Sequence, residues 1–118
     1  IIMISSLYAT FGRKNRMPYV LSKHAMHGAC KTLAIELGKK GIRVNTISPG
    51  FIDTKLTRKN LSEKEILKVK NHIPLGRMGV AKNIADTVKF LLSRQASYIS
   101  GTDIVVDGGF SAGGFMGV

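Results

Sequence analysis

The first fifty residues place one long helical pattern between two apolar runs, and this order constrains the fold more than any other feature. Residues 1–4 are an unbroken apolar run, typical of a strand buried on both faces of a parallel sheet. Residues 18–39 are predicted to form a helix from residues at helical spacing, Met26, Ala29, Leu33 and Leu37. A second strand, ended by a turn at residues 49–50, is predicted from the β-branched Ile42, Val44 and Ile47. This order predicts a right-handed βαβ crossover within a parallel sheet.

The rest of the chain predicts an insertion, one more helix and one more strand. Residues 54–74 are polar and basic, and Ser62 and Glu65 stand at capping-box spacing for a short helix. We expect this insertion to act as a lid. Residues 81–93 have the pattern of an amphipathic helix, residues 104–106 that of a strand, and the tail from Gly108 that of a loop or flexible end. A chain of 118 residues is then expected to form one compact α/β unit.

The formal charge of +11 raises the question of a nucleic-acid partner. The basic residues are spread along the chain and are not interleaved with aromatic residues that would stack on bases. Three interpretations remain open: a solvated surface, which we favour, an anionic substrate or carrier protein, and nucleic acid, which is the least favoured. We therefore expect no nucleic-acid partner.

Other residue patterns exclude further classes of protein. No apolar run reaches the roughly 20 residues of a membrane span and no segment resembles a signal peptide, so we expect a cytoplasmic protein without a membrane partner. Cys30 is the only cysteine, and it is expected to be a small buried hydrophobe. His24 and His27 lack a carboxylate at ligand spacing, so no metal site is expected.

Tyr19 and Lys23 are the first candidates for chemistry, because residues four apart share one face of a helix. A phenol with its ordinary pKa of about 10 is a poor base at neutral pH, but a nearby ammonium favours the phenolate. Such a pair suits proton transfer to a carbonyl or from an alcohol. The spacing alone also fits a solvated pair on the surface.

The motifs around this pair resemble the classical short-chain dehydrogenase/reductase family over nearly the whole chain. Ser6 stands before Tyr19 at the family's serine-to-tyrosine spacing, and residues 19–23 match its Tyr-x-x-x-Lys motif with the usual serine before the lysine. Other segments match the family in the same order, at residues 42–45, 48–54, 74–77, 97–101 and 106–109.

The resemblance implies an oxidoreductase that moves a hydride between a nicotinamide cofactor and a carbonyl or secondary alcohol. Tyr19 would be the general acid or base, Lys23 would favour its phenolate and bind the nicotinamide ribose, and Ser6 would hydrogen-bond the substrate oxygen. Ser5 would be structural. Further cofactor contacts are implied in the segment after the second strand, at Pro49, Gly50, Ile52 and Thr54.

The resemblance also implies the fold, the cofactor and the partners. Residues 1–118 would be a partial NAD(P)-binding domain, the C-terminal portion of a Rossmann-type doubly wound parallel sheet. The cofactor would be NAD or NADP. The substrate would be a small carbonyl or alcohol compound, with an anionic or carrier-bound one as an interpretation of the lysines in residues 54–74. Family members commonly form dimers or tetramers, so a homodimer or homotetramer is expected.

Several family motifs have no counterpart in this sequence. The glycine-rich turn that binds pyrophosphate, the Asn-Asn-Ala-Gly segment and the residue that separates NAD from NADP are absent. We therefore expect most of the cofactor-binding half to lie outside these 118 residues, which alone would be inactive. The alternative is a truncated remnant that acts only as an interaction module.

Overall fold

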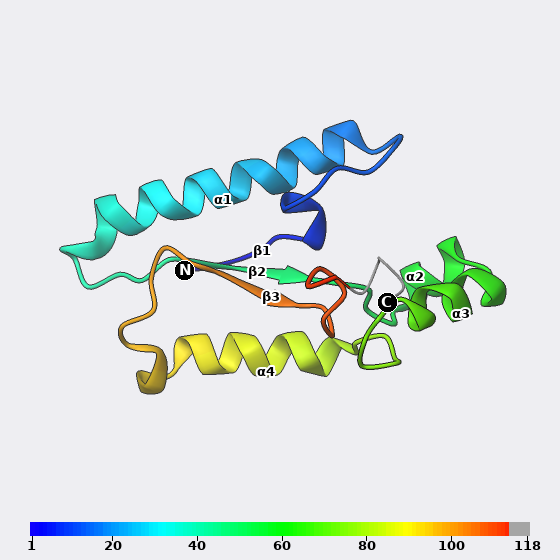
Figure 1. The fold of residues 1–118 in the computed structure, drawn as a ribbon. Coiled ribbons are helices and arrows are strands. Elements are labelled where there is room, and N and C mark those ends of the chain that lie inside the picture. The colour runs from blue at the N-terminus through cyan, green and yellow to red at the C-terminus, as the bar shows by residue number, and fades with distance from the viewer. Residues whose placement is uncertain (114–118) are drawn as a thin grey trace.

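The computed structural model describes residues 1–113 of the chain as a three-stranded parallel sheet between helices. The strands are β1 (Ile2–Ile4), β2 (Asn45–Pro49) and β3 (Asp103–Val106), in that order across the sheet. Helix α1 (Met17–Gly38) covers one face and α4 (Ala81–Leu92) covers the other (Figure 1). The predicted α/β class and the parallel sheet are confirmed.

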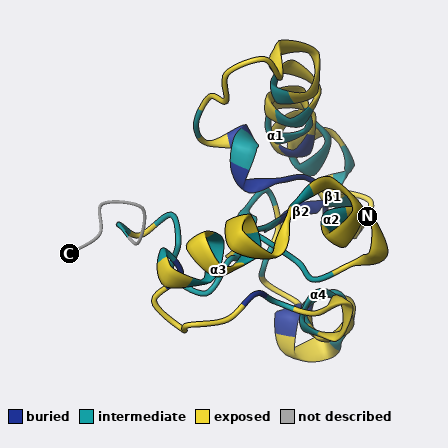
Figure 2. Cartoon of the chain, turned by 90° about the vertical axis from the view of Figure 1, so that its right-hand side faces the viewer, coloured by how far each residue is buried: buried dark blue, intermediate teal, exposed yellow. Residues whose placement is uncertain are grey.

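Both crossovers step across the sheet in the same direction, from β1 to β2 and from β2 to β3. Their helices nevertheless lie on opposite faces, as the edge-on view of Figure 1 and the end view of Figure 2 agree. Two such crossovers must have opposite hands. The rule that βαβ connections are right-handed therefore holds for only one of the two.

The sheet is apolar on the α4 side. Ile47 and Leu91 are almost completely buried there with Ala96, and partly buried Ile84 and Val88 of α4 pack against them. Arg43, just before β2, extends over the end of α4 and donates a hydrogen bond of 2.7 Å to the carbonyl oxygen of Leu91. Burial of this face is the main hydrophobic stabilisation of the fold.

The α1 side of the sheet is polar. Asp103 of β3 accepts hydrogen bonds from the hydroxyls of Thr46 at 2.7 Å and Ser48 at 2.9 Å, and both of these β2 residues are buried. His27 of α1 lies 3.4 Å from the same carboxylate. Helix α1 therefore packs on a hydrogen-bonded network instead of an apolar surface.

Most predicted elements are confirmed with small shifts of their ends. The capping box at Ser62 and Glu65 is present, at the start of α3 (Glu63–Asn71). The sequence did not predict α2 (Lys55–Asn60), which Thr54 caps, or the 3₁₀ turns η1 (Leu7–Ala9) and η2 (Arg94–Ala96). The predicted loop from Gly108 is confirmed as far as residue 113, and the rest of that tail lies outside the described residues.

Two expectations about the strands were wrong. The second strand starts at Asn45 rather than Ile42, because the N–H of Val44 is turned to the Ser100 hydroxyl at 3.2 Å. Within the described residues the first strand is not buried on both faces, since Ile2 and Met3 are only partly buried and Ile4 is 44% exposed. Within residues 1–113, β1 pairs only with β2.

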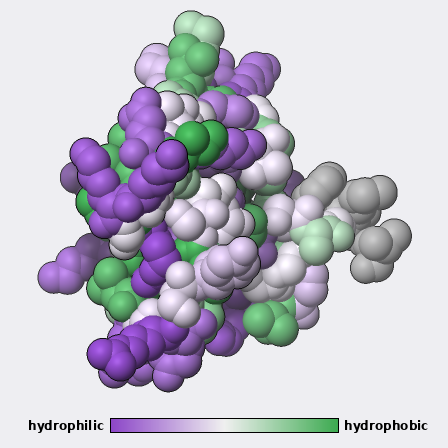
Figure 3. Space-filling view, turned by 90° about the vertical axis from the view of Figure 1, so that its left-hand side faces the viewer, coloured by the Kyte–Doolittle hydropathy of each residue, from purple (hydrophilic) through white to green (hydrophobic). Residues whose placement is uncertain are grey.

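The surface agrees with a dispersed charge. Figure 3 views the end of the molecule at which α1 stops, and hydrophilic and apolar areas are interspersed over this face. None of the helices in residues 1–113 combines the length and apolarity that a membrane span requires.

Candidate functional site

The site is built where the strands end. Parallel strands present their carboxyl ends at one edge of the sheet, and open α/β sheets bind ligands outside that edge. Here the segment after β1 leads through η1 and a basic loop to α1, the segment after β2 leads to α2, and β3 is followed by a glycine turn. These segments, far apart in sequence, meet at one end of the molecule (Figure 1).

Tyr19 and Lys23 lie side by side in the first turns of α1, as their spacing predicted. The Lys23 ammonium nitrogen is 5.6 Å from the centroid of the Tyr19 ring. It also donates a hydrogen bond of 3.0 Å to the carbonyl oxygen of Ile4, at the end of β1. An ammonium has three N–H donors, so two remain for other partners. The end of β1 thus fixes the lysine, and Tyr19 stays 44% exposed.

The two serines after β1 have different partners. Ser5 is buried, and its hydroxyl donates to the carbonyl oxygen of Lys23 at 3.2 Å, which ties β1 to α1. Ser6 is also buried, and its Oγ accepts a hydrogen bond from the Tyr8 N–H at 3.3 Å as the cap of η1. This bond uses an acceptor position of Ser6 and leaves its hydroxyl hydrogen available.

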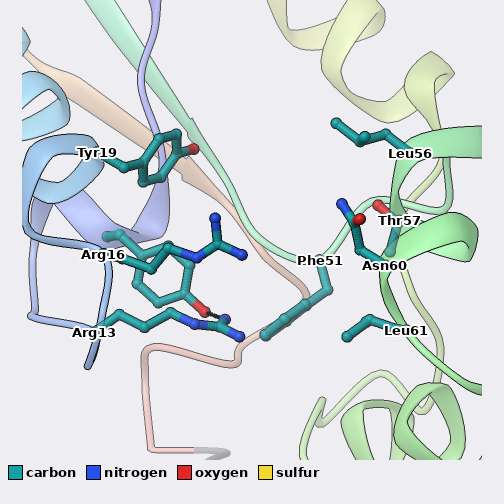
Figure 4. Close-up of a pocket in the computed structure, with 9 residues that line it drawn as sticks. Arg13, Arg16, Tyr19, Phe51, Leu56, Thr57, Asn60 and Leu61 are labelled. Carbon is teal, nitrogen blue, oxygen red and sulfur yellow. Dashed lines mark hydrogen bonds between the residues drawn. The ribbon is translucent and has the colours of Figure 1, made fainter.

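A cavity of about 330 Å³ opens beside Tyr19. Figure 4 shows Tyr19, Arg16 and Arg13 on one side, Leu56, Thr57, Asn60 and Leu61 on the other, and Phe51 between them; Tyr8 also lines the cavity. This volume lies within the range of small-molecule sites. Tyr19 is the one predicted site residue among those lining the cavity; Ser6, Lys23, Pro49, Gly50, Ile52 and Thr54 are not.

Aromatic rings connect the segments around this cavity. Tyr8 meets both Phe11 and Tyr19 edge to face, at centroid distances of 5.7 and 6.4 Å. Phe110, in the turn after β3, lies 6.4 Å from Phe11 and 5.2 Å from Phe51. The rings therefore join all three loops that follow the strands.

The residues at and after the end of β2 for which cofactor contacts were predicted pack against other parts of the chain. A Cβ atom on Gly50 would lie 2.5 Å from the Cβ of Asp107, so the close approach of β3 requires glycine here. Ile52 pairs with Gly79 in an isolated parallel bridge, and its carbonyl oxygen accepts from the Thr57 hydroxyl at 2.7 Å. Pro49 is the last residue of β2.

Thr54 caps α2 with a defined set of hydrogen bonds. Its Oγ1 accepts from the Thr57 N–H at 3.1 Å and lies 3.0 Å from the Thr57 hydroxyl oxygen. Because the single hydroxyl hydrogen of Thr57 goes to Ile52, Thr54 must be the donor between the two hydroxyls. Thr54 therefore keeps one lone pair and can only accept a further hydrogen bond.

Other candidate side chains have structural partners. Asp53 pairs with the Arg58 guanidinium through two hydrogen bonds of 2.7 and 2.6 Å, which lower the pKa of the Asp53 carboxyl. Asp107 accepts from two N–H groups of the turn after β3. Asp103 links β2, β3 and α1.

Cys30 is buried under α1, as predicted. Burial and the nearby Asp103 carboxylate raise the pKa of its thiol above the ordinary value. Its Sγ donates weakly to the carbonyl oxygen of Val44 at 3.4 Å. A thiol held in the neutral form and packed in this way is a structural group.

Sequence reasoning missed the residues that shape the cavity. Arg13 and Arg16 were interpreted with the other basic residues as solvated surface, and Phe51 and Asn60 had no assigned role. Phe51 and Asn60 meet Tyr19 only because the segments after β1 and β2 converge. A spacing pattern within one segment carries no signal for such contacts.

Comparison with known proteins places this geometry in a family. The model of the family described as "Enoyl-(Acyl carrier protein) reductase" matches residues 1–111. The chain is 45% identical to a 3-oxoacyl-[acyl-carrier-protein] reductase FabG of Buchnera aphidicola and 41% identical to the human (3R)-3-hydroxyacyl-CoA dehydrogenase. Each match covers 92% of this chain, but only 44% and 41% of those relatives, so the chain spans less than half of their length.

Solved structures show the same fold. A 4-hydroxyisoleucine dehydrogenase complexed with NADH matches with a TM-score of 0.90 and 40% identity, over 96% of this chain and 47% of that one. A putative 2-deoxy-D-gluconate 3-dehydrogenase from Agrobacterium tumefaciens with bound NADP matches with a TM-score of 0.89 and 37% identity, over 94% and 46%. The sheet described above is therefore part of a Rossmann-type dehydrogenase fold.

Proposed function

Because this chain belongs to the short-chain dehydrogenase/reductase family, we propose that the intact protein transfers a hydride between a nicotinamide cofactor and a carbonyl or secondary alcohol. One observation carries the proposal. The Lys23 ammonium is anchored to the end of β1 and lies beside the Tyr19 ring, and Tyr19 faces a cavity of substrate size. This is the arrangement that a phenol needs to exchange a proton with a bound carbonyl or alcohol.

Each of the three residues has a distinct part in the proposed reaction. Tyr19 gives its hydroxyl proton to the carbonyl oxygen during reduction and takes it back during oxidation. Lys23 stabilises the phenolate by its positive charge, with its position set by Ile4. Ser6 donates its free hydroxyl hydrogen to the substrate oxygen and so orients it toward Tyr19.

The residues around the carboxyl edge suit a nicotinamide cofactor, NAD or NADP. Two N–H donors of Lys23 are unused, and an ammonium so placed can bind the hydroxyls of a ribose. Thr54 has only an acceptor position left, which matches the N–H donors of a carboxamide. Pro49, Gly50 and Ile52 would contribute backbone and apolar contacts. The bound cofactor supplies or accepts the hydride.

Residues 54–74, which include α2 and α3, form the proposed substrate loop or lid of an otherwise partial NAD(P)-binding domain comprising residues 1–118. Leu56, Thr57 and Asn60 of α2 line the cavity opposite Tyr19, so movement of this helix would open or close it. The substrate is proposed to be a small molecule, either free or attached to a carrier, as the names of the relatives include both kinds. A homodimer or homotetramer is proposed for the intact protein.

The experiment is the substitution Tyr19→Phe in the intact protein with cofactor present. Loss of the hydroxyl should reduce kcat by about 10²- to 10⁴-fold, the usual contribution of general acid-base catalysis. Tyr98→Phe is the matched control, because Tyr98 is fully exposed and lies outside the cavity. Unchanged turnover by the Tyr19→Phe protein at neutral pH would remove Tyr19 from the mechanism.

The alternative of an inactive remnant makes a different prediction. A remnant that only binds partners would have an intact mass near 12.8 kDa and would bind no nicotinamide cofactor. A mass about twice this value, together with saturable NADH or NADPH binding in a fluorescence titration, would exclude it. The same titration decides between NAD and NADP.

A further inference from the structure

Two guanidinium groups line the cavity beside Tyr19, those of Arg13 and Arg16. Among the lining residues that the structure describes, within residues 1–113, none is acidic. The ion pairs found in residues 1–113 involve other residues, so neither arginine has a carboxylate partner there. Two positive charges that face one cavity without a counterion form a site of positive potential.

Local structure turns both arginines toward the cavity. The N–H of Arg16 donates to the carbonyl oxygen of Arg13 at 3.3 Å, and Asn15 between them has a φ of 61°, in the left-handed region. This closes a four-residue turn, whose ends lie within about 7 Å of each other. Lys14, in the middle of the turn, is exposed and does not line the cavity. The turn thus separates two cavity-facing charges from a solvent-facing one.

The two guanidinium groups differ in how they are held. Arg13 donates to the Tyr8 hydroxyl and lies over the Tyr8 ring, with its Cζ 5.1 Å from the centroid. Arg16 extends into the cavity between Tyr19 and Phe51, where the Asn60 amide faces it from α2 (Figure 4). Arg16 is also the N-cap residue of α1 and makes no side-chain capping bond, and the first turn of α1 has no acidic residue. The helix dipole adds to the positive potential at this point.

From these observations we propose that the substrate carries its own carboxylate, which Arg16 binds with help from Arg13 while Tyr19 acts on the carbonyl or alcohol. The planar fork of a guanidinium matches a carboxylate with two parallel hydrogen bonds. Leu56 and Leu61 on the opposite wall lower the local dielectric and strengthen this interaction. The inference rests on the proposed function and specifies its substrate as a free oxo or hydroxy acid.

The test compares acetoacetate with acetoacetamide, which has nearly the same shape but no charge, in the intact protein with cofactor. We expect kcat/KM and calorimetric affinity to favour the acid. Arg16→Ala should lower both for acetoacetate by about 10- to 100-fold and leave acetoacetamide unchanged. Arg16→Lys should recover only part of this loss, and Lys14→Ala is the matched control that changes neither.

Several results would overturn the inference. The first is equal kcat/KM and equal affinity for acetoacetate and acetoacetamide. The second is that Arg16→Ala lowers these two quantities equally for both compounds. The third is that inorganic phosphate displaces acetoacetate at a lower concentration than acetoacetate itself needs to bind. Failure of the proposed function looks different. Charge-dependent binding of acetoacetate without any turnover would leave the carboxylate site in place and remove the hydride transfer. If both proposals hold, Tyr19→Phe loses turnover and keeps acetoacetate binding.

Discussion

Replacing Gly50 with alanine in the intact, cofactor-free protein should lower its free energy of unfolding. The new Cβ would lie 2.5 Å from the Cβ and 2.7 Å from the Cα of Asp107, whereas carbon atoms in contact prefer about 3.5–4.0 Å. One chain must therefore move by about 1 Å. The Gly50 N–H also donates to the carbonyl oxygen of Val106 at 3.0 Å, so this movement strains the pairing of β2 with β3.

The magnitude follows from two opposing effects. Overpacking of this kind costs about 1–3 kcal/mol. Loss of glycine freedom in the unfolded chain offsets about 0.4–1 kcal/mol. The expected net loss is therefore roughly 1–2 kcal/mol.

Urea denaturation of the cofactor-free protein measures this loss from the transition midpoint and slope. Gly38→Ala is the matched control, because a Cβ at this end of α1 would meet nothing within 4 Å. It should leave stability unchanged or raise it by up to about 1 kcal/mol. If Gly50→Ala leaves stability unchanged and only weakens cofactor binding, then Gly50 serves the approach of the cofactor and not the packing on Asp107.

Two further predictions concern the polar face under α1. Asp103→Ala should cost about 2 kcal/mol in urea denaturation, because it removes the acceptor that two buried hydroxyls share, and Asp103→Asn, which keeps one oxygen, should cost less; equal losses would refute this account. Burial raises the pKa of the Cys30 thiol, so the unfolded chain loses this proton first as pH rises. Its contribution to stability is complete below about pH 9 and is lost above it. Cys30→Ala should remove this part of the loss of stability at alkaline pH. In the native protein, Cys30 should react with a thiol reagent far more slowly than it does in urea; equal rates would show that the thiol is accessible in the native protein.

The helices could be predicted because their signals lie within one segment. The periodicity of α4 and the Ser62–Glu65 capping box each depend on residues less than four turns apart. The stripe on α1 was predicted less well, since Ala29 is exposed and Cys30 is the buried residue of that turn. The reason is the polar face of the sheet, which α1 covers with His27 and Cys30 as well as with its apolar residues.

The candidate site likewise contains contacts that the sequence predicted and contacts that it did not. Tyr19 and Lys23 share one helix face, so their spacing predicted their proximity. The anchor of Lys23 is a backbone oxygen nineteen residues earlier, and Phe110, near the opposite end of the chain, contacts Phe51 of the cavity wall. A contact with a backbone atom, or with a ring from another loop, leaves no periodic pattern in the sequence.

The separation of site and core decides how the variants can be interpreted. Tyr19, Arg13 and Arg16 are exposed at the carboxyl edge, whereas Ile47 and Leu91 are buried between the sheet and α4. Exposed substitutions away from packed contacts usually change stability by less than about 0.5 kcal/mol. Loss of activity in Tyr19→Phe, or of charge discrimination in Arg16→Ala, would therefore report on the chemistry of the cavity. A large loss of stability in either variant would instead mean that contacts at the start of α1 support the fold.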